Sequence, residues 1–423
     1  MRTTVGIIGA GPAGLLLARL LHRTGIDCVV LESRTRAYAE RRQRAGMLEQ
    51  GTVDVLRACG AGERLDAEGL VHHGIELRFE GERHHIDFPA LTGGRTVTIY
   101  AQTEIVKDLI SLQLADRPPL LFEAEALAVE KPESASPVVR FVCGGRERTL
   151  ACDWVVGCDG GHGVARAAFP AGTGRTYAHD YPYSWLGILA DVPPSCEELV
   201  YARGAGGFAL HSMRSPSVSR LYLQVPNGTD PGDWPDERVW DELAARFAVA
   251  GDWRLERGPV TAKSVTPMRS WVHEPMRHGR LFLAGDAAHI VPPTGAKGLN
   301  LAVSDVRLLA RGFAELHRSG STELLDQYSE LALERVWQAT RFSYDMTKML
   351  HAQPDGDAFE HRMQLARLRR IAVSRPAAAE LAANYTGLPL PEPQGPPSPA
   401  GDWWLTGGRW SGGSAAGNGH SRG

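Results

Sequence analysis

The sequence has few cysteines, little net charge and no long apolar run. Its six cysteines, in 423 residues, are scattered and form no Cys-x-x-Cys pair, which argues against a disulfide framework or a metal site and predicts reduced thiols in a cytoplasmic protein. A formal net charge of −3 gives no general attraction to nucleic acid or to a membrane surface. No segment is long and charge-free enough to cross a bilayer. Glycines and Pro12 interrupt the apolar N-terminus, so it does not resemble a signal peptide.

A glycine-rich motif near the N-terminus is the first strong signal in the chain. An apolar strand at residues 3–8 leads into Gly9, Gly11 and Gly14, and after a helix the next apolar strand ends at Glu32. In this setting the glycines let the backbone approach a pyrophosphate at the helix N-terminus, and the acid reaches a ribose hydroxyl. We therefore predict a dinucleotide-binding domain. No second motif of this kind follows, so a nicotinamide cofactor is expected to bind without a Rossmann domain of its own.

A strand, a loop and a helix lie in sequence much further along the chain. The apolar run at residues 281–284 leads into Gly285 and Asp286, a Pro- and Gly-rich loop follows, and an amphipathic helix is expected from residue 301. Asp286 can accept hydrogen bonds from sugar hydroxyls, and the free N–H groups after Gly295 suit an electron-rich group. An ordinary connection would explain Gly-Asp alone. Together with the N-terminal motif, the segment predicts a second part of the dinucleotide site.

The middle of the chain has the alternating pattern of antiparallel strands. The clearest strands lie at residues 185–191, 199–201, 208–214 and 220–225, residues 75–88 form a hairpin, and helices are expected at 102–114 and 323–352. We predict an α/β fold (α+β overall), in which an antiparallel sheet is inserted into a Rossmann-like domain with C-terminal helices. The predicted parts are a cofactor domain of residues 1–73, 97–180 and 269–390, a substrate-binding sheet of residues 74–96 and 181–268, and a Pro/Gly/Ser-rich tail, 391–423, expected to be disordered.

One predicted hairpin brings polar side chains together. The period of two along a strand puts Ser212 and Arg214 on one face, and Arg220 and Tyr222 share a face of the next strand. If the strands pair, a hydroxyl, two guanidinium groups and a phenol converge. A bidentate pair between arginine and a carboxylate, worth about 1.5–3 kcal/mol when partly desolvated, would hold a benzoate. From spacing alone, a polar outer face with incidental arginines explains the pattern equally well.

Three motifs in this order resemble the single-component, class A flavoprotein monooxygenases. They are the glycine motif with Glu32, Asp159-Gly160 followed by Arg166, and Gly285-Asp286 running to Asn300. The similarity extends from about residue 3 to residue 390. The run 292–300, which includes a lysine that most of the family lacks, and the run 44–51 are most similar to members that hydroxylate 4-hydroxybenzoate. Methionine at position 47 replaces an expected valine, a change between apolar residues.

The resemblance implies a fold of the glutathione-reductase type and a specific reaction. The expected activity is ortho-hydroxylation of 4-hydroxybenzoate to 3,4-dihydroxybenzoate with FAD, NADPH and O2, through a hydroperoxide at flavin C4a. It also implies a homodimer. Because a phenol has a pKa of about 10, a base is needed to make the phenolate at neutral pH. The alternatives are a ring-modified substrate such as 3-amino-4-hydroxybenzoate or a dihydroxybenzoate, a flavin reductase on the same fold, and a flavin-binding sensor without catalysis.

The resemblance also assigns roles to single residues. Tyr201 contacts the substrate hydroxyl, and Tyr385 and His72 continue a proton relay. The Pro293 carbonyl lies near the ring, and Arg220 balances flavin charge and influences isoalloxazine movement. The residues implied in holding the substrate carboxylate are Ser212, Arg214 and Tyr222. Those implied in FAD binding are Gly9, Gly11, Gly14, Glu32, Arg44, Gln102, Asp159, Asp286, Ala296, Lys297, Gly298, Leu299 and Asn300.

The nicotinamide cofactor is expected to meet a separate set of residues. Those implied by the resemblance are Tyr38, Arg42, Arg44, His162, Arg166 and Arg269. The segment 33–38 departs from the family's pattern, which begins with arginine then glutamine. Its basic surroundings favour the extra phosphate of NADPH, with NADH as the alternative.

Overall fold

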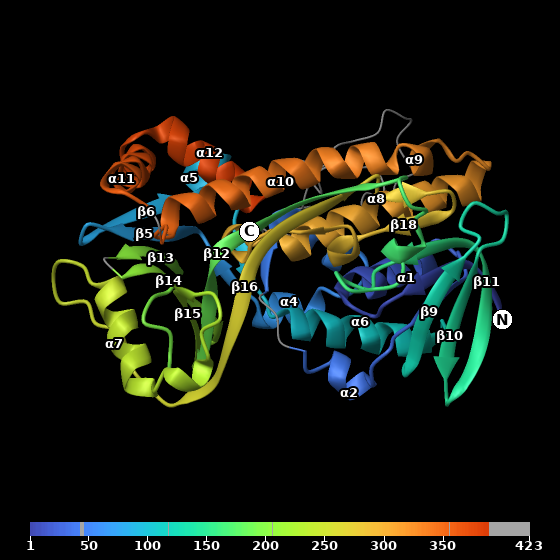
Figure 1. The fold of residues 1–423 in the computed structure, drawn as a ribbon, viewed down its shortest axis with the longest axis horizontal. Coiled ribbons are helices and arrows are strands. Elements are labelled where there is room, and N and C mark those ends of the chain that lie inside the picture. The colour runs from blue at the N-terminus through green and yellow to red at the C-terminus, as the bar shows by residue number, and fades with distance from the viewer. Residues whose placement is uncertain (43–45, 117, 205, 355, 389–423) are drawn as a thin grey trace, which may run out of the picture.

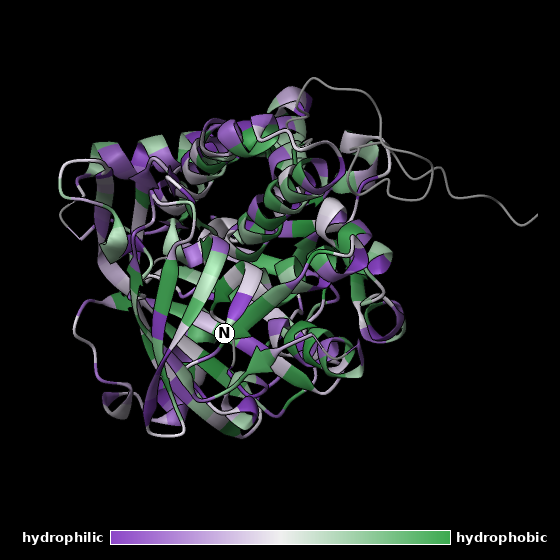
Figure 2. Ribbon diagram, turned by 90° about the vertical axis from the view of Figure 1, so that its right-hand side faces the viewer, coloured by the Kyte–Doolittle hydropathy of each residue, from purple (hydrophilic) through white to green (hydrophobic). Residues whose placement is uncertain are grey.

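The computed structural model describes residues 1–42, 46–116, 118–204, 206–354 and 356–388. Two large sheets lie side by side, and the long helix α10 (Tyr328–Leu350) runs across both (Figure 1). Hydrophobic residues are concentrated in the strands, while the outer helices carry mixed faces (Figure 2). Within the described ranges, no helix is long and apolar enough to span a membrane.

The first sheet has parallel strands at its centre. Strand β1 (Arg2–Ile8) lies between β2 (Cys28–Leu31) and β11 (Arg146–Gly157), and β18 (Leu281–Leu283) follows β11, all in parallel. The strands are apolar because helices cover the faces of such sheets. The other strands of this sheet are β8 (Leu120–Leu121), β9 (Ala124–Glu130), β10 (Val138–Cys143) and β17 (Arg277–His278).

Helices α1 (Pro12–Arg23) and α8 (Gly298–Ser319) pack against each other beside this sheet, and α6 (Gln102–Asp116) packs on α1. Helix α8 begins three residues before the expected position, so its N-terminus lies closer to the Pro- and Gly-rich loop. Pro12 suits the first turn of α1 because an N–H there has no partner within the helix. Shorter helices are α2 (Arg36–Ala39), α3 (Gln50–Ala58) and α4 (Glu63–Glu68).

The second sheet is the predicted antiparallel one, and it confirms the α/β fold class with a second, mostly antiparallel layer. Its order is β19–β16–β12–β15–β14–β13–β5–β6, with one parallel pair between β13 and β5. The strands are β5 (Gly74–Phe79), β6 (Glu82–Asp87), β12 (Arg175–Ala190), β13 (Leu199–Gly204), β14 (Gly207–Ser215), β15 (Val218–Pro226), β16 (Val260–Glu274) and β19 (His289–Ile290). Helix α7 (Asp236–Phe247) packs on β13 and β14.

Two long strands connect the regions that the sequence predicts as separate domains. The predicted boundaries at residues 181 and 268 fall inside β12 and β16, which pair with each other along nearly their whole length. The division into domains therefore stays a prediction. A small third sheet of β3 (Met47–Glu49), β7 (Val97–Ile99) and β4 (Leu70–His72) lies apart from the two large sheets in the hydrogen-bonding pattern. Helices α11 (Ala358–Val373) and α12 (Arg375–Thr386) follow α10.

Two predicted elements differ in detail. The helix expected at 323–352 is interrupted at Gln327, which separates α9 (Glu323–Asp326) from α10. Tertiary contacts outweigh helix propensity there, because Leu325 packs against Gly312 and the Tyr328 hydroxyl donates to the Leu283 carbonyl at 2.7 Å. The predicted hairpin at 75–88 is confirmed for β5 and β6, but Phe88 begins helix α5 (Phe88–Thr92).

Candidate active site

The glycine motif forms a tight cradle at the N-terminus of α1. Gly9 has a φ of +103°, which favours glycine. A Cβ on Gly14 would collide with the Gly9 carbonyl, whereas a Cβ on Gly11 would meet nothing within 4 Å. A Glu32 carboxylate oxygen accepts a hydrogen bond from the Ala10 N–H at 2.8 Å, so the acid lies beside the loop. The open backbone at a helix N-terminus, next to a carboxylate, fits the pyrophosphate and ribose of a dinucleotide.

The turn that carries Asp286 is fixed by a buried carboxylate. One oxygen of Asp305 accepts from the Gly285 N–H at 2.9 Å and contacts His289 Nε2 at 2.7 Å. Burial alone would lower the pKa of His289, but the charge and hydrogen bond of Asp305 raise it overall. A Cβ on Gly285 would lie 3.2 Å from Ala302 in α8. The turn is thus closely packed against the helix that follows it, and Asp305 was not found by sequence reasoning.

Asp159 organises its own loop. It follows β11, and its Oδ2 accepts from the Ala165 N–H at 2.9 Å, while a Cβ on Gly163 would collide with its carboxyl group. Burial raises the pKa of Asp159, opposed by hydrogen bonds from backbone N–H groups. Arg166 donates to the Gly161 carbonyl at 2.9 Å and stacks over Trp271 at 4.4 Å from the ring centroid. Its predicted contact with a nicotinamide cofactor stays a prediction.

The loop before α8 is joined to β3 by Asn300. Its Oδ1 accepts from the Glu49 N–H at 2.9 Å and from the Thr52 hydroxyl at 2.7 Å, and its Nδ2 donates to the Met47 and Ala296 carbonyls, each at 3.0 Å. The side chain of Asn300 is therefore used within the protein. The backbone of residues 296–300 is the part of this segment that can meet a cofactor edge.

Lys297 belongs to a buried cluster of charges. Its ammonium group lies 2.7 Å from Glu49, whose other oxygen is 2.8 Å from Arg335. The Lys297 ammonium group also donates to the carbonyls of Asn384 and Tyr385. Burial lowers the pKa of Lys297, and the charge of Glu49 opposes this. Sequence reasoning missed Glu49 and Arg335, because no local pattern relates positions so far apart in the chain.

The predicted hairpin of β14 and β15 is confirmed. Ser212 lies opposite Arg220, and Leu210 lies opposite Tyr222. Arg214 lines one cavity together with Ser212, Arg220 and Tyr222. It is also lined by Gly46, Met47, Ile99, Ala101, Trp185, Leu199, Tyr201, Met213, Pro293 and Ala296.

Two arginines, Arg214 and Arg220, give the cavity a positive charge. Burial lowers the pKa of Arg214, and the charge of Arg220 lowers it further. Arg220 lies over the Tyr222 ring at 5.3 Å from its centroid, and its Nη1 is buried without a hydrogen-bond partner among the described residues. Arg214 Nη2 donates to the Thr103 hydroxyl at 2.7 Å. Two adjacent guanidinium groups in a partly buried cavity favour an anionic ligand.

Tyr201 lines the same cavity and forms a pair with the buried Tyr385. The Tyr201 and Tyr385 hydroxyl oxygens are 2.6 Å apart, and Tyr201 donates to the Thr294 carbonyl at 3.2 Å. Either hydroxyl can be the donor in the contact between the two tyrosines. Burial raises the pKa of both phenols. The resemblance predicted this pair from positions 184 residues apart, and the structure brings the two hydroxyls into contact.

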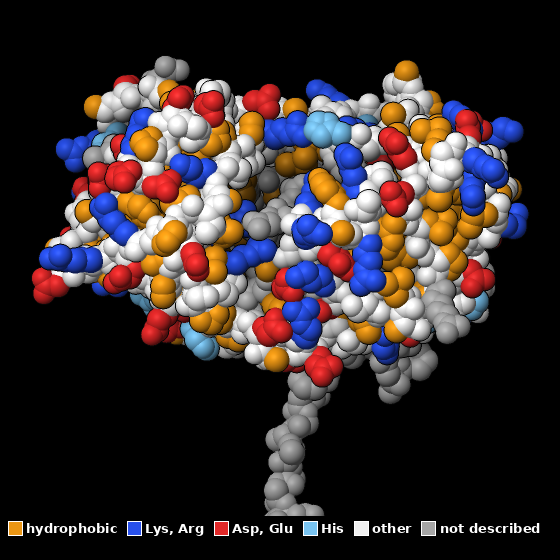
Figure 3. All heavy atoms as spheres, turned by 90° about the horizontal axis from the view of Figure 1, so that it is seen from below, with side chains coloured by type: hydrophobic (Ala, Val, Ile, Leu, Met, Phe, Trp, Pro, Cys, Tyr) orange, Lys and Arg blue, Asp and Glu red, His pale blue; other side chains and the backbone are white. Residues whose placement is uncertain are grey.

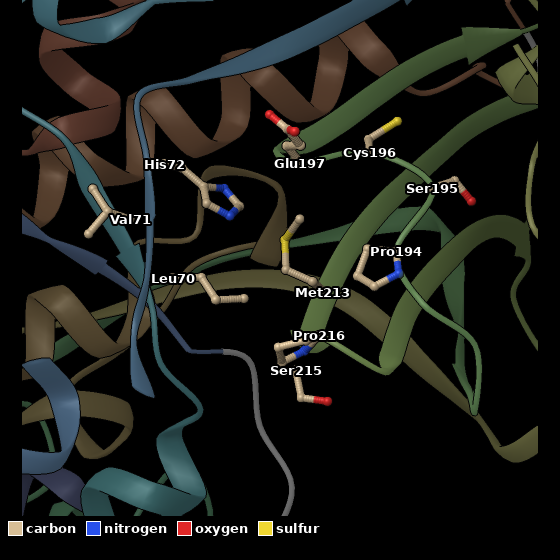
Figure 4. Close-up of a pocket in the computed structure, with 10 residues that line it drawn as sticks. All are labelled: Leu70, Val71, His72, Pro194, Ser195, Cys196, Glu197, Met213, Ser215 and Pro216. Carbon is tan, nitrogen blue, oxygen red and sulfur yellow. The ribbon is translucent and has the colours of Figure 1, made fainter. Parts of the chain in front are cut away.

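His72 lies in a second, outer cavity (Figure 4). Its ring is buried, both ring nitrogens lack a hydrogen-bond partner among the described residues, and burial lowers its pKa to about 4. Pro194, Glu197 and Met213 also line this cavity, and Met213 lines the substrate cavity as well. Within the described ranges, no hydrogen bond joins His72 to Tyr385, so its place in the relay stays a prediction.

The residues predicted to bind the nicotinamide cofactor lie on separate elements. Tyr38, in α2, is 50% exposed, and Arg34 lies over its ring at 5.4 Å. Arg269 is in β16, opposite Asp180 of β12. The predicted residues Arg42 and His162 lie in loops. Arg44 and the tail 391–423 lie outside the described residues. On one face of the molecule, Lys and Arg side chains gather around a central hollow (Figure 3).

Comparison with known proteins defines the class. Residues 2–343 match the family described as FAD binding domain. The chain belongs to this family, and it is an FAD-dependent monooxygenase of the flavoprotein aromatic hydroxylases. The dinucleotide cofactor of this chain is therefore FAD.

Individual relatives show which aromatic hydroxylases the chain is similar to. The chain is 46% identical, over 92% of its length and 96% of the relative, to p-hydroxybenzoate hydroxylase of Acinetobacter baylyi. It is 30% identical, over 86% of its length and 91% of the relative, to 3-amino-4-hydroxybenzoate 2-monooxygenase of Streptomyces cremeus. The fold matches the crystal structure of p-nitrophenol 4-monooxygenase PnpA from Pseudomonas putida DLL-E4 with a TM-score of 0.78 and 17% identity, covering 92% of this chain and 99% of that one.

Proposed function

We propose that this chain hydroxylates 4-hydroxybenzoate next to its phenol group, giving 3,4-dihydroxybenzoate. The observation that carries the proposal is one cavity lined by two arginines and by Tyr201, whose hydroxyl is hydrogen-bonded to that of Tyr385. An aromatic ring with a carboxylate and a phenol has the matching chemistry at its two ends. The 46% identity to a p-hydroxybenzoate hydroxylase supports the same substrate.

The carboxylate end of the substrate is assigned to Ser212, Arg214 and Tyr222. A carboxylate entering here relieves the repulsion between Arg214 and Arg220 and can use the planar fork of a guanidinium group. Trp185 and Leu210 line the cavity between its polar groups. These apolar walls exclude water and hold the ring in one orientation.

The phenol end is assigned to Tyr201. A substrate phenol that donates a hydrogen bond to the Tyr201 oxygen can pass its proton to Tyr201, which passes its own to Tyr385 through the 2.6 Å contact. The resulting phenolate pushes electron density onto the adjacent ring carbon, where oxygen is added. His72 would complete this path toward the outer cavity, and the Pro293 carbonyl would lie beside the ring.

FAD, when bound and reduced, supplies the activated oxygen. The residues that fit its pyrophosphate and ribose are the Gly9, Gly11 and Gly14 loop with Glu32, and those assigned to the rest of the cofactor are Gln102, Asp159, Asp286 and the backbone of residues 296–300. Arg220 is placed to balance negative charge near the ring system. Reduction by NADPH is assigned to Tyr38, Arg42, His162, Arg166 and Arg269. A cytoplasmic homodimer that binds neither nucleic acid nor membrane completes the proposal.

The test is product analysis of the FAD-loaded protein with NADPH, air and 4-hydroxybenzoate. We expect 3,4-dihydroxybenzoate in proportion to NADPH consumed, with little peroxide. The second candidate substrate is 3-amino-4-hydroxybenzoate, supported by the 30% identical relative. Efficient hydroxylation of that compound, with only peroxide formed from 4-hydroxybenzoate, would replace the first proposal by the second. A higher kcat/KM with NADH would overturn the assignment of NADPH.

A further inference from the structure

Arg214 is held in place by a residue outside the substrate-binding sheet. Thr103 lies in the first turn of α6, is 4% exposed, and its hydroxyl oxygen accepts from Arg214 Nη2 at 2.7 Å. The preceding residue, Gln102, is one of those assigned to FAD. A single helical turn of the cofactor region therefore reaches an arginine of the substrate cavity.

The neighbouring residue on α6 does not compete for this role. Glu104 is bound by Arg64 at 2.6 Å and by Lys107 at 2.8 Å, so its carboxylate is directed to the other side of the helix turn. Its charge still favours the protonated form of Arg214 at longer range. The uncharged hydroxyl of Thr103 orients the guanidinium group of Arg214 by a hydrogen bond and adds no charge.

The physical effect of this contact is preorganisation. A free arginine side chain has high rotamer entropy, and part of it must be lost when the guanidinium group is fixed on a ligand. Thr103 anchors one N–H of Arg214 before the ligand arrives. A neutral acceptor of this kind does not neutralise the guanidinium group, whereas an acidic residue in its place would.

We infer that Thr103 is a positioning residue for the substrate carboxylate, acting through Arg214. This inference rests on the proposed function, because it requires an aromatic carboxylate in the cavity. It predicts that loss of the hydroxyl weakens the binding of the carboxylate and leaves the chemical step unchanged.

The experiment uses the FAD-loaded enzyme with Thr103→Val, which keeps the shape of the side chain. The dissociation constant of 4-hydroxybenzoate is followed by the change in flavin absorbance. We expect it and KM to rise about ten-fold, which equals about 1.4 kcal/mol, while kcat changes less than two-fold. Thr103→Ser restores the hydroxyl and is expected to restore both values.

Two controls separate positioning from general damage. The neutral analogue 4-hydroxybenzamide lacks the carboxylate, so its dissociation constant should change less than two-fold in Thr103→Val. In an Arg214→Lys background the same change should have little further effect. Thr98→Val is the matched control, because Thr98 is also a buried threonine (8% exposed) and lies in β7 of the small sheet.

The outcomes are distinct. Equal weakening for the acid and the amide, no weakening of the acid, or failure of Thr103→Ser to recover would overturn the role of Thr103. If the wild-type enzyme does not bind 4-hydroxybenzoate, the proposed function fails first, and the series is repeated with 3-amino-4-hydroxybenzoate. If neither acid binds, the inference about Thr103 falls as well.

Discussion

Replacing Asp305 by alanine should destabilise the protein at the turn that carries Asp286. Asp305 and His289 are both 1% exposed, and one carboxylate oxygen serves both the His289 ring and the Gly285 N–H. The change leaves the buried His289 ring and the buried Gly285 N–H without their shared partner. Removing one partner of a buried ion pair costs about 3–5 kcal/mol, so the free energy of unfolding should fall by that amount. Urea unfolding of the FAD-loaded protein, followed by circular dichroism, measures it.

The surface pair of Arg2 and Asp153 provides the control for this measurement. Their side chains are 67% and 36% exposed, so Asp153→Ala should cost less than about 1 kcal/mol. Because the pKa of His289 is raised on folding, the contribution of its pair is complete below the unfolded pKa of about 6.5 and is lost as pH rises through the folded pKa. Equal, small losses for both variants, or an unchanged pH profile in Asp305→Ala, would refute the reasoning.

Three further outcomes are expected. Gly14→Ala puts a methyl group against the Gly9 carbonyl, so FAD binding, measured by titration of the apoprotein, should weaken at least about ten-fold, or about 1.4 kcal/mol; unchanged affinity would contradict the close packing. Tyr385→Phe removes a partner of Tyr201. The rate of hydroxylation should fall about ten-fold further than the rate of NADPH oxidation, and the difference should be measurable as released peroxide. Burial lowers the pKa of His211 to about 4, so it takes up a proton on unfolding; stability is lost as pH falls from about 6.5 toward 4, by up to about 1.4 kcal/mol per pH unit. His211→Gln should flatten that slope in urea titrations.

Local sequence patterns predicted much of the fold. The glycine motif predicted the cradle at α1, and strand alternation predicted that the polar side chains of β14 and β15 would converge if the two strands paired, as they do. Both predictions depend on neighbours within one short segment or one hairpin. The contact of Tyr201 with Tyr385 came from resemblance, because nothing in the spacing of two tyrosines so far apart indicates it.

The parts that sequence could not predict are partnerships between distant segments. Glu49, Asp305 and Thr103 lie in ordinary helical or strand contexts, where a carboxylate or a hydroxyl normally faces solvent. Their burial depends on how α6 and α8 approach other elements, and no periodicity encodes that approach. The break at Gln327 has the same origin, since it follows from packing of the residues on either side.

The pairing of β12 with β16 has a consequence for how this enzyme can be rebuilt. Both strands run from the cofactor side to the far end of the substrate sheet as one paired ladder, from Arg175 opposite Glu274 to Ala190 opposite Val260, with its register shifted between Asp180 and Ser184 and again between Leu189 and Ala190. Exchange of the substrate sheet between relatives would therefore require cuts inside both of these paired strands, where no flexible linker absorbs a mismatch. New specificity is more accessible through side chains that line the cavity than through transplantation of a module.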